Sequence, residues 1–142
     1  MSTVPSAAEL AQRTCVPCSH KAIRENGIEK LSAERTGDFL RALEPGWSLA
    51  PQPQVPDAPD ALFRTYNFRN FATAAAFANA VGDAAETHKH HPAILLEWGR
   101  VGVWWWSHAL NGVCVCANEL HENDFVMAAR TDEIAASAAG RK

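Results

Sequence analysis

The clearest pattern of apolar and polar positions lies between Asn70 and Lys89. Apolar residues recur there at intervals of three and four, as on one face of an α-helix, at Phe71, Ala74, Ala75, Ala78, Val81 and Ala85. Asn70 is a suitable N-cap, and Pro92 disfavours helical geometry in the residue before it, which predicts an end near Lys89. The pattern therefore predicts an alanine-rich helix that packs closely against a sheet or another helix.

Short extended segments flank this helix in pairs. Trp47 to Ala50 and Leu62 to Asn67 are predicted to form a hairpin, because the proline-rich stretch between them cannot form regular helix. Ala93 to Glu97 and Val101 to Ser107 are predicted to form a second hairpin with a turn over residues 98–100. In the last strand, alternation places one set of side chains over the helices, namely Val101, Val103, Trp105 and Ser107. The opposite, more open face then carries Gly102, Trp104, Trp106 and His108.

Two further helices are predicted outside the two hairpins. Between Ile28 and Leu43 apolar residues recur at roughly helical intervals, and Ser32 is able to cap a helix start. A last helix is predicted to start at the capping dipeptide of Asn123 and Asp124, with residues 135–142 fraying into solvent. The order α-β-β-α-β-β-α predicts an α+β fold, a single four-stranded antiparallel sheet with three helices on one face.

Length and charge restrict the class of protein. A chain of 142 residues, 47% of them hydrophobic, is long enough for one domain with a core, which we expect over residues 26–142 after a loosely ordered N-terminal arm over residues 1–25. A net charge of -3 and a pI near 6.0 provide no basic stripe for nucleic acid. No apolar run approaches the ~20 residues of a membrane-spanning helix. No secretory signal is visible in the N-terminal residues, so we expect a cytoplasmic protein without nucleic-acid or membrane partners.

The four cysteines leave two interpretations open. They fall in two close pairs, Cys15 with Cys18 and Cys114 with Cys116. Cys15, Cys18 and His20 could begin a zinc site, but a structural site needs four ligands and the others would have to come from distant residues. In a reducing compartment the alternative is a mobile arm that carries two thiols.

The segment from His88 to His108 contains four of the six histidines and four of the five tryptophans of the chain. Three imidazoles and a water could form a catalytic zinc site, although adjacent His90 and His91 point in different directions on an extended chain. Each histidine could instead be a structural residue at a helix end or a strand edge. The third interpretation is acid-base chemistry on a flat heteroaromatic substrate, because imidazole titrates near neutral pH and tryptophan binds flat rings.

The same region resembles the pterin-4a-carbinolamine dehydratases, also called 4a-hydroxytetrahydrobiopterin dehydratases. The resemblance covers Leu31 to Arg141. Its most specific residues form three groups, which are Glu86-x-x-x-His90-His91-Pro92, Glu97-Trp98-Gly99-x-Val101-x-Val103, and Ser107-His108. The stretch from Asn123 to Ala135 is similar to a bacterial branch of the family that is associated with phenylalanine hydroxylase.

The resemblance implies an activity and partners. The activity is dehydration of 4a-hydroxytetrahydropterin to quinonoid dihydropterin, which supports tetrahydrobiopterin regeneration after an aromatic amino acid hydroxylase has acted. No metal and no other cofactor is implied. Members of the family form dimers and tetramers, so a homodimer or homotetramer is expected. Animal members also bind a homeodomain transcription factor, which makes a non-catalytic binding module the alternative function.

Site residues are carried over one at a time. His90, His91 and His108 match the three active-site histidines of the family. We expect His90 and His91 to share the acid and base roles, with His91 as the acid, and His108 to position the pterin. Glu86 and Asp124 are expected to orient the histidines through hydrogen bonds, since a carboxylate fixes the tautomer of an imidazole and raises its basicity.

Other residues of the region have less defined roles. Trp106 either lines the pterin pocket or packs within the sheet or a subunit interface. The chain departs from the family at an insert over residues 113–119, which could prolong the last strand, cover the site or form a surface loop, and which puts the role of Asp124 in question. His88 and His121 are not part of the match.

Overall fold

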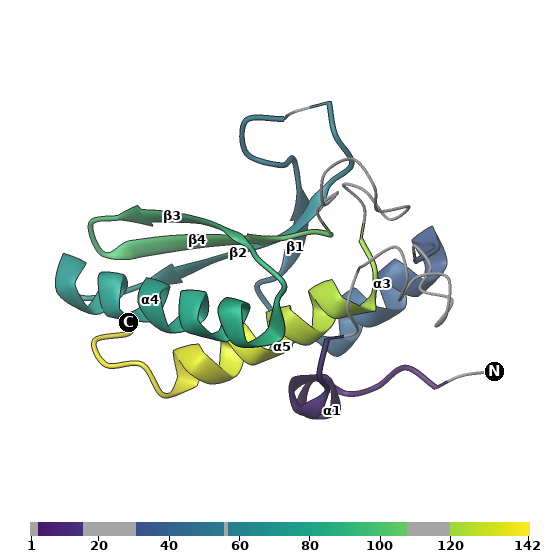
Figure 1. Ribbon diagram of the computed structural model, residues 1–142, viewed down its shortest axis with the longest axis horizontal. Helices are drawn as coiled ribbons and strands as arrows, with labels where there is room; N and C mark the ends of the chain where they lie inside the picture. Colours follow the sequence, from purple (N-terminus) through teal and green to yellow (C-terminus); the bar gives the residue numbers. More distant parts are fainter. Residues whose placement is uncertain (1–2, 16–30, 56, 108–119) are drawn as a thin grey trace.

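Four antiparallel strands form one sheet, and the helices lie on one side of it (Figure 1). The computed structural model describes residues 3–15, 31–55, 57–107 and 120–142. The strands are β1 (Ser48–Ala50), β2 (Ala61–Asn67), β3 (Ala93–Glu97) and β4 (Arg100–Trp105), in the spatial order β1-β2-β4-β3. The helices are α1 (Ala7–Gln12), α3 (Ala33–Ala42), α4 (Phe71–His88) and α5 (Glu122–Ala136). The predicted α+β fold and both predicted hairpins are confirmed.

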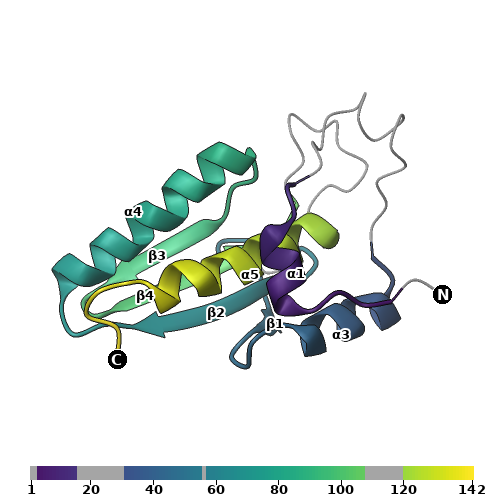
Figure 2. The same cartoon turned by 90° about the horizontal axis from the view of Figure 1, so that it is seen from below.

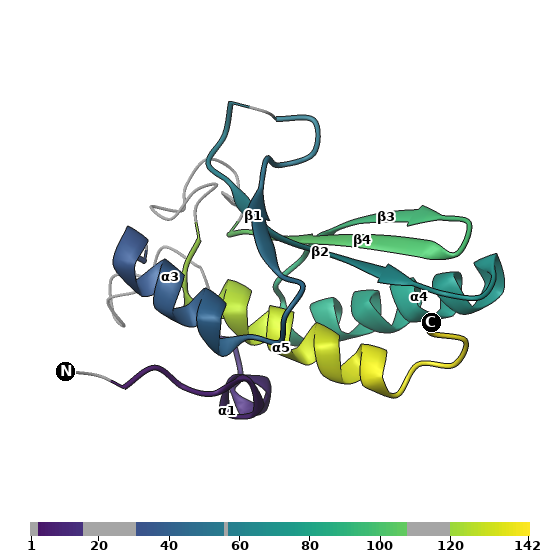
Figure 3. The ribbon, with the colours of Figure 1, turned by 180° about the vertical axis from the view of Figure 1, so that it is seen from behind.

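The two faces of the sheet differ as the alternation of β4 predicted. Val101, Val103 and Trp105 are fully buried and pair with residues of β2 that share the helix-covered face. Trp104 lies on the opposite face, where its ring stacks on Phe63 with centroids 4.5 Å apart. The connection between β1 and β2 extends away from the helices, as Figure 3 shows from behind. The helices cover only the face of the sheet that carries Val101, Val103 and Trp105. A side chain near the end of β4 can therefore contact the helices only if it lies on that face.

Helix α4 begins after the predicted cap, because the Asn70 side chain accepts a hydrogen bond from the Thr73 N–H at 2.8 Å. The predicted apolar stripe is wrong at Phe71, which is 49% exposed, and it omits Phe77, which is 2% exposed. The stripe that is buried is formed by Ala74, Phe77, Val81 and Ala85. At ~100° per residue, Phe71 lies about 75° around the helix from the middle of this stripe. The Phe77 ring fills the core instead, with its centroid 4.8 Å from that of Tyr66. None of the helices in the described ranges is both long and apolar enough to cross a membrane.

Both ends of the chain are more ordered than the sequence predicted. The N-terminal arm, expected to be loosely ordered over residues 1–25, contains helix α1, which lies across α5 (Figure 2). The Ser6 hydroxyl and the Glu9 carboxylate exchange hydrogen bonds with each other's backbone N–H groups in a capping box. Leu10 of this helix is fully buried. Ala11 is buried as well, so tertiary packing of these two residues stabilises a helix of six residues that has no long periodic pattern.

The C-terminal tail also differs from the prediction, because it returns to the sheet instead of fraying. The Arg69 N–H donates to the Gly140 carbonyl at 2.7 Å, and the Lys142 N–H donates to the Asn67 carbonyl at 2.9 Å. Gly140 has a φ of 73°, which a residue with a side chain adopts only under strain, and an added Cβ would lie 2.5 Å from the Thr73 hydroxyl oxygen. The glycine thus permits the turn that docks the tail beside the start of α4.

Candidate active site

A tight turn at the end of α4 sets the directions of two adjacent histidines. Lys89 caps the helix in the left-handed conformation with a φ of 51°. The His90 N–H donates to the Ala85 carbonyl at 3.1 Å and the Lys89 N–H donates to the Glu86 carbonyl at 3.3 Å, the two bonds of a Schellman motif. The turn brings His90 back toward the helix layer and leaves His91 on the surface.

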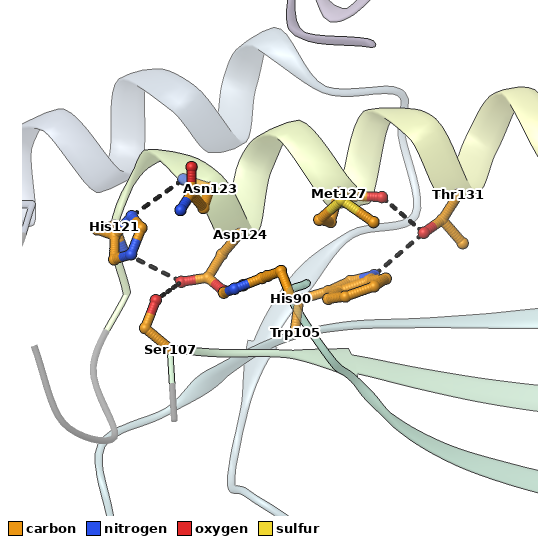
Figure 4. A network of polar contacts seen from close by, with 8 residues as sticks. All are labelled: His90, Trp105, Ser107, His121, Asn123, Asp124, Met127 and Thr131. Carbon is orange, nitrogen blue, oxygen red and sulfur yellow. Dashed lines mark hydrogen bonds and ion pairs between the residues drawn. The ribbon is translucent and has the colours of Figure 1, made fainter. Parts of the chain in front are cut away.

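His90 forms a buried pair with Asp124 of α5, shown in Figure 4. Its Nε2 atom lies 2.6 Å from Asp124 Oδ1, and Asp124 is completely buried. The His90 ring lies parallel to that of Trp105, with an interplanar angle of 8°. Trp105 is held in turn, because its Nε1–H donates to the Thr131 hydroxyl at 3.1 Å. The sheet and α5 together therefore fix the plane of the His90 ring.

The Asp124 carboxylate accepts hydrogen bonds from three parts of the chain. Besides its contact with His90, its Oδ2 atom accepts from the Ser107 hydroxyl at 3.0 Å and from the His121 backbone N–H at 3.0 Å. Such donors stabilise the ionised carboxylate in a buried position. An ionised Asp124 requires a proton on His90 Nε2, so in the neutral imidazole Nδ1 is the nitrogen with the lone pair.

The second imidazole-carboxylate pair is exposed. His91 Nε2 lies 2.7 Å from Glu86 Oε1, and the side chains are 55% and 80% exposed. Glu86 belongs to the last turn of α4, so the short turn at Lys89 brings the two side chains together. Two consecutive histidines thus have carboxylate partners in opposite environments, one in the core and one in solvent.

The structure brings together four of the predicted site residues as these two pairs. Asp124 lies beside His90 despite the insert over residues 113–119, which itself falls outside the described residues, as does His108. Trp106 directly follows β4 and is 7% exposed. Ser107, the last described residue before the gap, is in contact with Asp124.

Sequence reasoning missed the contributions of Ser107 and His121. Ser107 was placed correctly on the helix-covered face, but its hydrogen bond to Asp124 depends on the position of α5, which the alternation of a strand does not reveal. The predicted start of α5 at Asn123 and Asp124 is wrong, because His121 is the N-cap and the helix begins at Glu122. The signal was a capping-box spacing, with an acceptor side chain at position 121 and a carboxylate three residues later.

His121 is therefore a buried imidazole beside the site. It is 2% exposed, and its ring centroid lies 6.0 Å from that of His90. Burial is the main cause that lowers the pKa of His121 below its ordinary value, and the charge of Asp124 acts in the opposite direction. His121 is thus favoured in its neutral form at the pH where an unperturbed histidine begins to be protonated.

No group of three histidine, cysteine or acidic side chains is placed to hold a metal ion within the described ranges. Cys15 is half-buried against the core, whereas Cys18, His20, Cys114 and Cys116 lie outside those ranges. A groove of about 580 Å³ lies between α4 and α5, and none of the predicted site residues lines it. The polar cluster around His90 and Asp124 remains the arrangement best suited to proton transfer.

Comparisons with known proteins identify one family for this chain. The family model described as pterin 4 alpha carbinolamine dehydratase matches residues 29–134. A protein of Microcystis aeruginosa is 44% identical over 126 residues, which cover 89% of this chain and 93% of that protein. One of Chlorobium luteolum is 41% identical over 126 residues, covering 89% of this chain and 95% of its own length. Both are named as candidate pterin-4-alpha-carbinolamine dehydratases.

A solved structure resembles the fold. The crystal structure of a transcriptional coactivator/pterin dehydratase from Brucella melitensis superimposes with a TM-score of 0.60 and 28% sequence identity. The match covers 75% of this chain and 99% of the Brucella chain.

Proposed function

The chain belongs to the pterin-4-alpha-carbinolamine dehydratase family and is accordingly an enzyme of that kind, and on this premise we propose that it acts by histidine acid-base catalysis. The substrate is a 4a-hydroxytetrahydropterin and the products are quinonoid dihydropterin and water. The observation that carries the mechanism is the pair of adjacent histidines, each with its own carboxylate, at 2.6 Å for His90 and 2.7 Å for His91.

The elimination needs one proton delivered and one removed. The 4a-hydroxyl accepts a proton and leaves as water when the bond between C4a and oxygen breaks. The N5–H bond gives up its proton, and its electron pair forms the double bond between N5 and C4a. The sum is one water released with no change in oxidation state, so the two proton transfers can be supplied by two imidazoles.

We assign the acid role to His91 and the base role to His90. His91 is exposed, so it can exchange protons with solvent and reach a hydroxyl of a bound ligand. His90 offers Nδ1 as the proton acceptor, since Nε2 is held by the Asp124 carboxylate, which also stabilises the imidazolium after the transfer. His108 would position the pterin, and Trp106 would contribute to the pocket.

The setting of the activity is a further part of the proposal. The enzyme would act in the cytoplasm and support tetrahydropterin regeneration after an aromatic amino acid hydroxylase. It would work as a homodimer or homotetramer. In the described sheet β1 and β3 are the edge strands, and unpaired edges of this kind are suited to strand pairing between subunits.

The test is the decay of freshly generated 4a-hydroxytetrahydropterin, followed by ultraviolet absorbance. We expect the wild-type protein to accelerate it and His91→Ala to lose about 100-fold or more of the acceleration, the size of a general acid-base contribution. His88→Ala is the matched control, because it removes a neighbouring histidine outside the two pairs and should keep full activity. Folded wild-type protein that leaves the decay rate unchanged would overturn the proposal and favour a binding module.

A further inference from the structure

The start of α5 is capped by a histidine side chain. His121 Nδ1 accepts a hydrogen bond from the Asn123 N–H at 3.1 Å, and the His121 N–H donates to Asp124 Oδ2 at 3.0 Å. The two bonds form a reciprocal capping box around the first turn of the helix. Serine, threonine, aspartate and asparagine are the usual N-caps, and their oxygen atoms accept without a change of protonation near neutral pH. An imidazole differs in that it accepts only while one ring nitrogen lacks a proton.

The cap and the active-site carboxylate are two ends of the same turn. Asp124 is the third residue of α5, so the position of its carboxylate depends on where and how tightly the helix begins. That carboxylate lies 2.6 Å from His90 Nε2 and also accepts from Ser107. Fraying of the first turn would move Asp124 away from both partners, because a helix start without a cap leaves several N–H groups unsatisfied.

We infer that His121 is a positioning residue for the dehydration, whose neutral imidazole caps α5 and so holds Asp124 against His90. The inference rests on the proposed function of the site. It assigns a role to a histidine that contributes no proton to the reaction. His121 acts through Asp124, and Asp124 acts through His90.

Protonation of His121 would remove the cap. A protonated Nδ1 becomes a donor and can no longer accept from the Asn123 N–H. The added charge would also lie at the positive end of the α5 dipole, where cations are unfavourable.

Several charged or titratable groups surround the His121 ring. Asp124 and Glu122 of α5 favour its protonation, whereas His90, from the connection after α4, disfavours it. Arg13 follows α1, and its Nη1 atom lies 3.8 Å from Glu122 Oε2, so it offsets part of the negative charge of Glu122. Burial is the largest cause, and together with the charge of a protonated His90 it lowers the pKa of His121. The neutral, capping form is therefore the one that the folded protein favours near neutral pH.

The experiment compares two variants at this position with a matched cap elsewhere. His121→Ala removes the acceptor, whereas His121→Asn retains an acceptor that does not titrate. Ser32→Ala removes the N-cap of α3, whose hydroxyl accepts from the Arg35 N–H at 3.2 Å and belongs to no part of the site. Each protein is first shown to be folded by chemical denaturation. The ring nitrogens of His90 are then followed by nuclear magnetic resonance from pH 5 to 8, and kcat and KM are measured over the same range.

We expect His121→Ala to shift the His90 ring resonances and to lower kcat at neutral pH by about fivefold, the rate equivalent of one lost helix cap, with a smaller change in KM. His121→Asn should restore the His90 resonances and kcat. It should also lose less activity than wild type as the pH falls below the range in which an unperturbed histidine titrates. Ser32→Ala should change neither the His90 resonances nor kcat. The inference would be overturned if His121→Ala left the His90 resonances and their titration unchanged, or if Ser32→Ala altered them equally.

The magnetic resonance measurement separates this inference from the proposed reaction. A wild-type protein that does not accelerate carbinolamine decay would contradict the proposed function. The effect of His121 on the His90 ring could still be present in that case, because it depends only on the capping geometry. Conversely, the enzyme could be active while its His90 resonances do not respond to His121→Ala. That result would support the proposed function and contradict the positioning role of His121.

Discussion

The His90 imidazole lies parallel to the Trp105 indole, with ring centroids 5.8 Å apart. Trp105 is the last residue of β4, one of the two inner strands of the sheet, and its Nε1–H donates to the Thr131 hydroxyl of α5. Thr131 donates its own hydroxyl to the Met127 carbonyl at 2.6 Å, so the orientation of the acceptor is fixed by the helix. The proposed base is thus supported on one side by a ring whose position depends on packing between sheet and helix.

Replacement of this tryptophan tests that support. Trp105→Phe keeps an aromatic ring but removes the donor to the buried Thr131 hydroxyl, so we expect the free energy of unfolding to fall by about 1 to 3 kcal/mol. Chemical denaturation measures the change. Trp98→Phe is the control, because Trp98 is 70% exposed and its replacement should change stability by less than about 0.5 kcal/mol. If the two variants lowered the free energy of unfolding equally, Trp105 would not be the packed, hydrogen-bonded ring that we expect beside His90.

The two carboxylates of the site should respond differently to loss of charge. Asp124→Asn places an amide among three donors in a fully buried position, so we expect both a loss of about 1 to 3 kcal/mol in stability and a fall in kcat of about 100-fold. Glu86→Gln changes a side chain that is 80% exposed, and its stability should stay within about 0.5 kcal/mol of wild type while kcat falls. Denaturation and carbinolamine decay measured on the same samples distinguish the two cases. A Glu86→Gln variant as unstable as Asp124→Asn would argue against this division.

The sequence predicted the sheet and α4 well because their patterns are long. The alternation from Val101 to Ser107 assigned both faces of β4, and the motif around His90 and His91 contains the two histidines that the structure pairs with carboxylates. Helix α1 could not be predicted in this way, since its order comes from burying Leu10 against α5 and not from its own periodicity. The cap at His121 was missed for a related reason, because histidine is rarely an N-cap and its role depends on the burial of its ring.

The only tyrosine of the chain offers a direct optical test of the core. The Tyr66 hydroxyl donates to Asp132 Oδ1 at 2.5 Å, and Arg64 contacts the same oxygen at 2.8 Å. Burial, and then the negative charge of Asp132, raise the pKa of Tyr66 above the ordinary 10.0. The folded protein should therefore show no tyrosinate absorbance as the pH passes 10, and tyrosinate should appear only together with unfolding.

The same shift gives the sign of the alkaline pH dependence. Because the folded state keeps the phenol protonated, its contribution to stability is fully present below pH 10 and declines above it, as the unfolded chain loses the proton first. Tyr66→Phe should remove this decline, which denaturation at pH 9 and pH 11 would measure. Reversible tyrosinate formation near pH 10 without unfolding would mean that the phenol is accessible.

The N-terminal helix lies outside the residues matched by the family model, yet it contacts the helix that carries Asp124. Leu10 is fully buried, the Arg130 Nε–H donates to the Arg13 carbonyl at 3.1 Å, and Arg13 approaches Glu122 in the first turn of α5. Leu10→Ala should therefore lower the free energy of unfolding by about 2 to 4 kcal/mol, as for other buried leucines. Leu49→Ala, at a position 42% exposed, is the matched control and should lose much less stability.

Amide hydrogen exchange would show whether the loss of stability in Leu10→Ala is local. We expect faster exchange along α5 in Leu10→Ala, with α4 less affected, because α1 contacts α5 directly. Wild-type exchange rates along α5 in that variant would mean that α1 contributes nothing to holding the helix on which Asp124 and its cap depend.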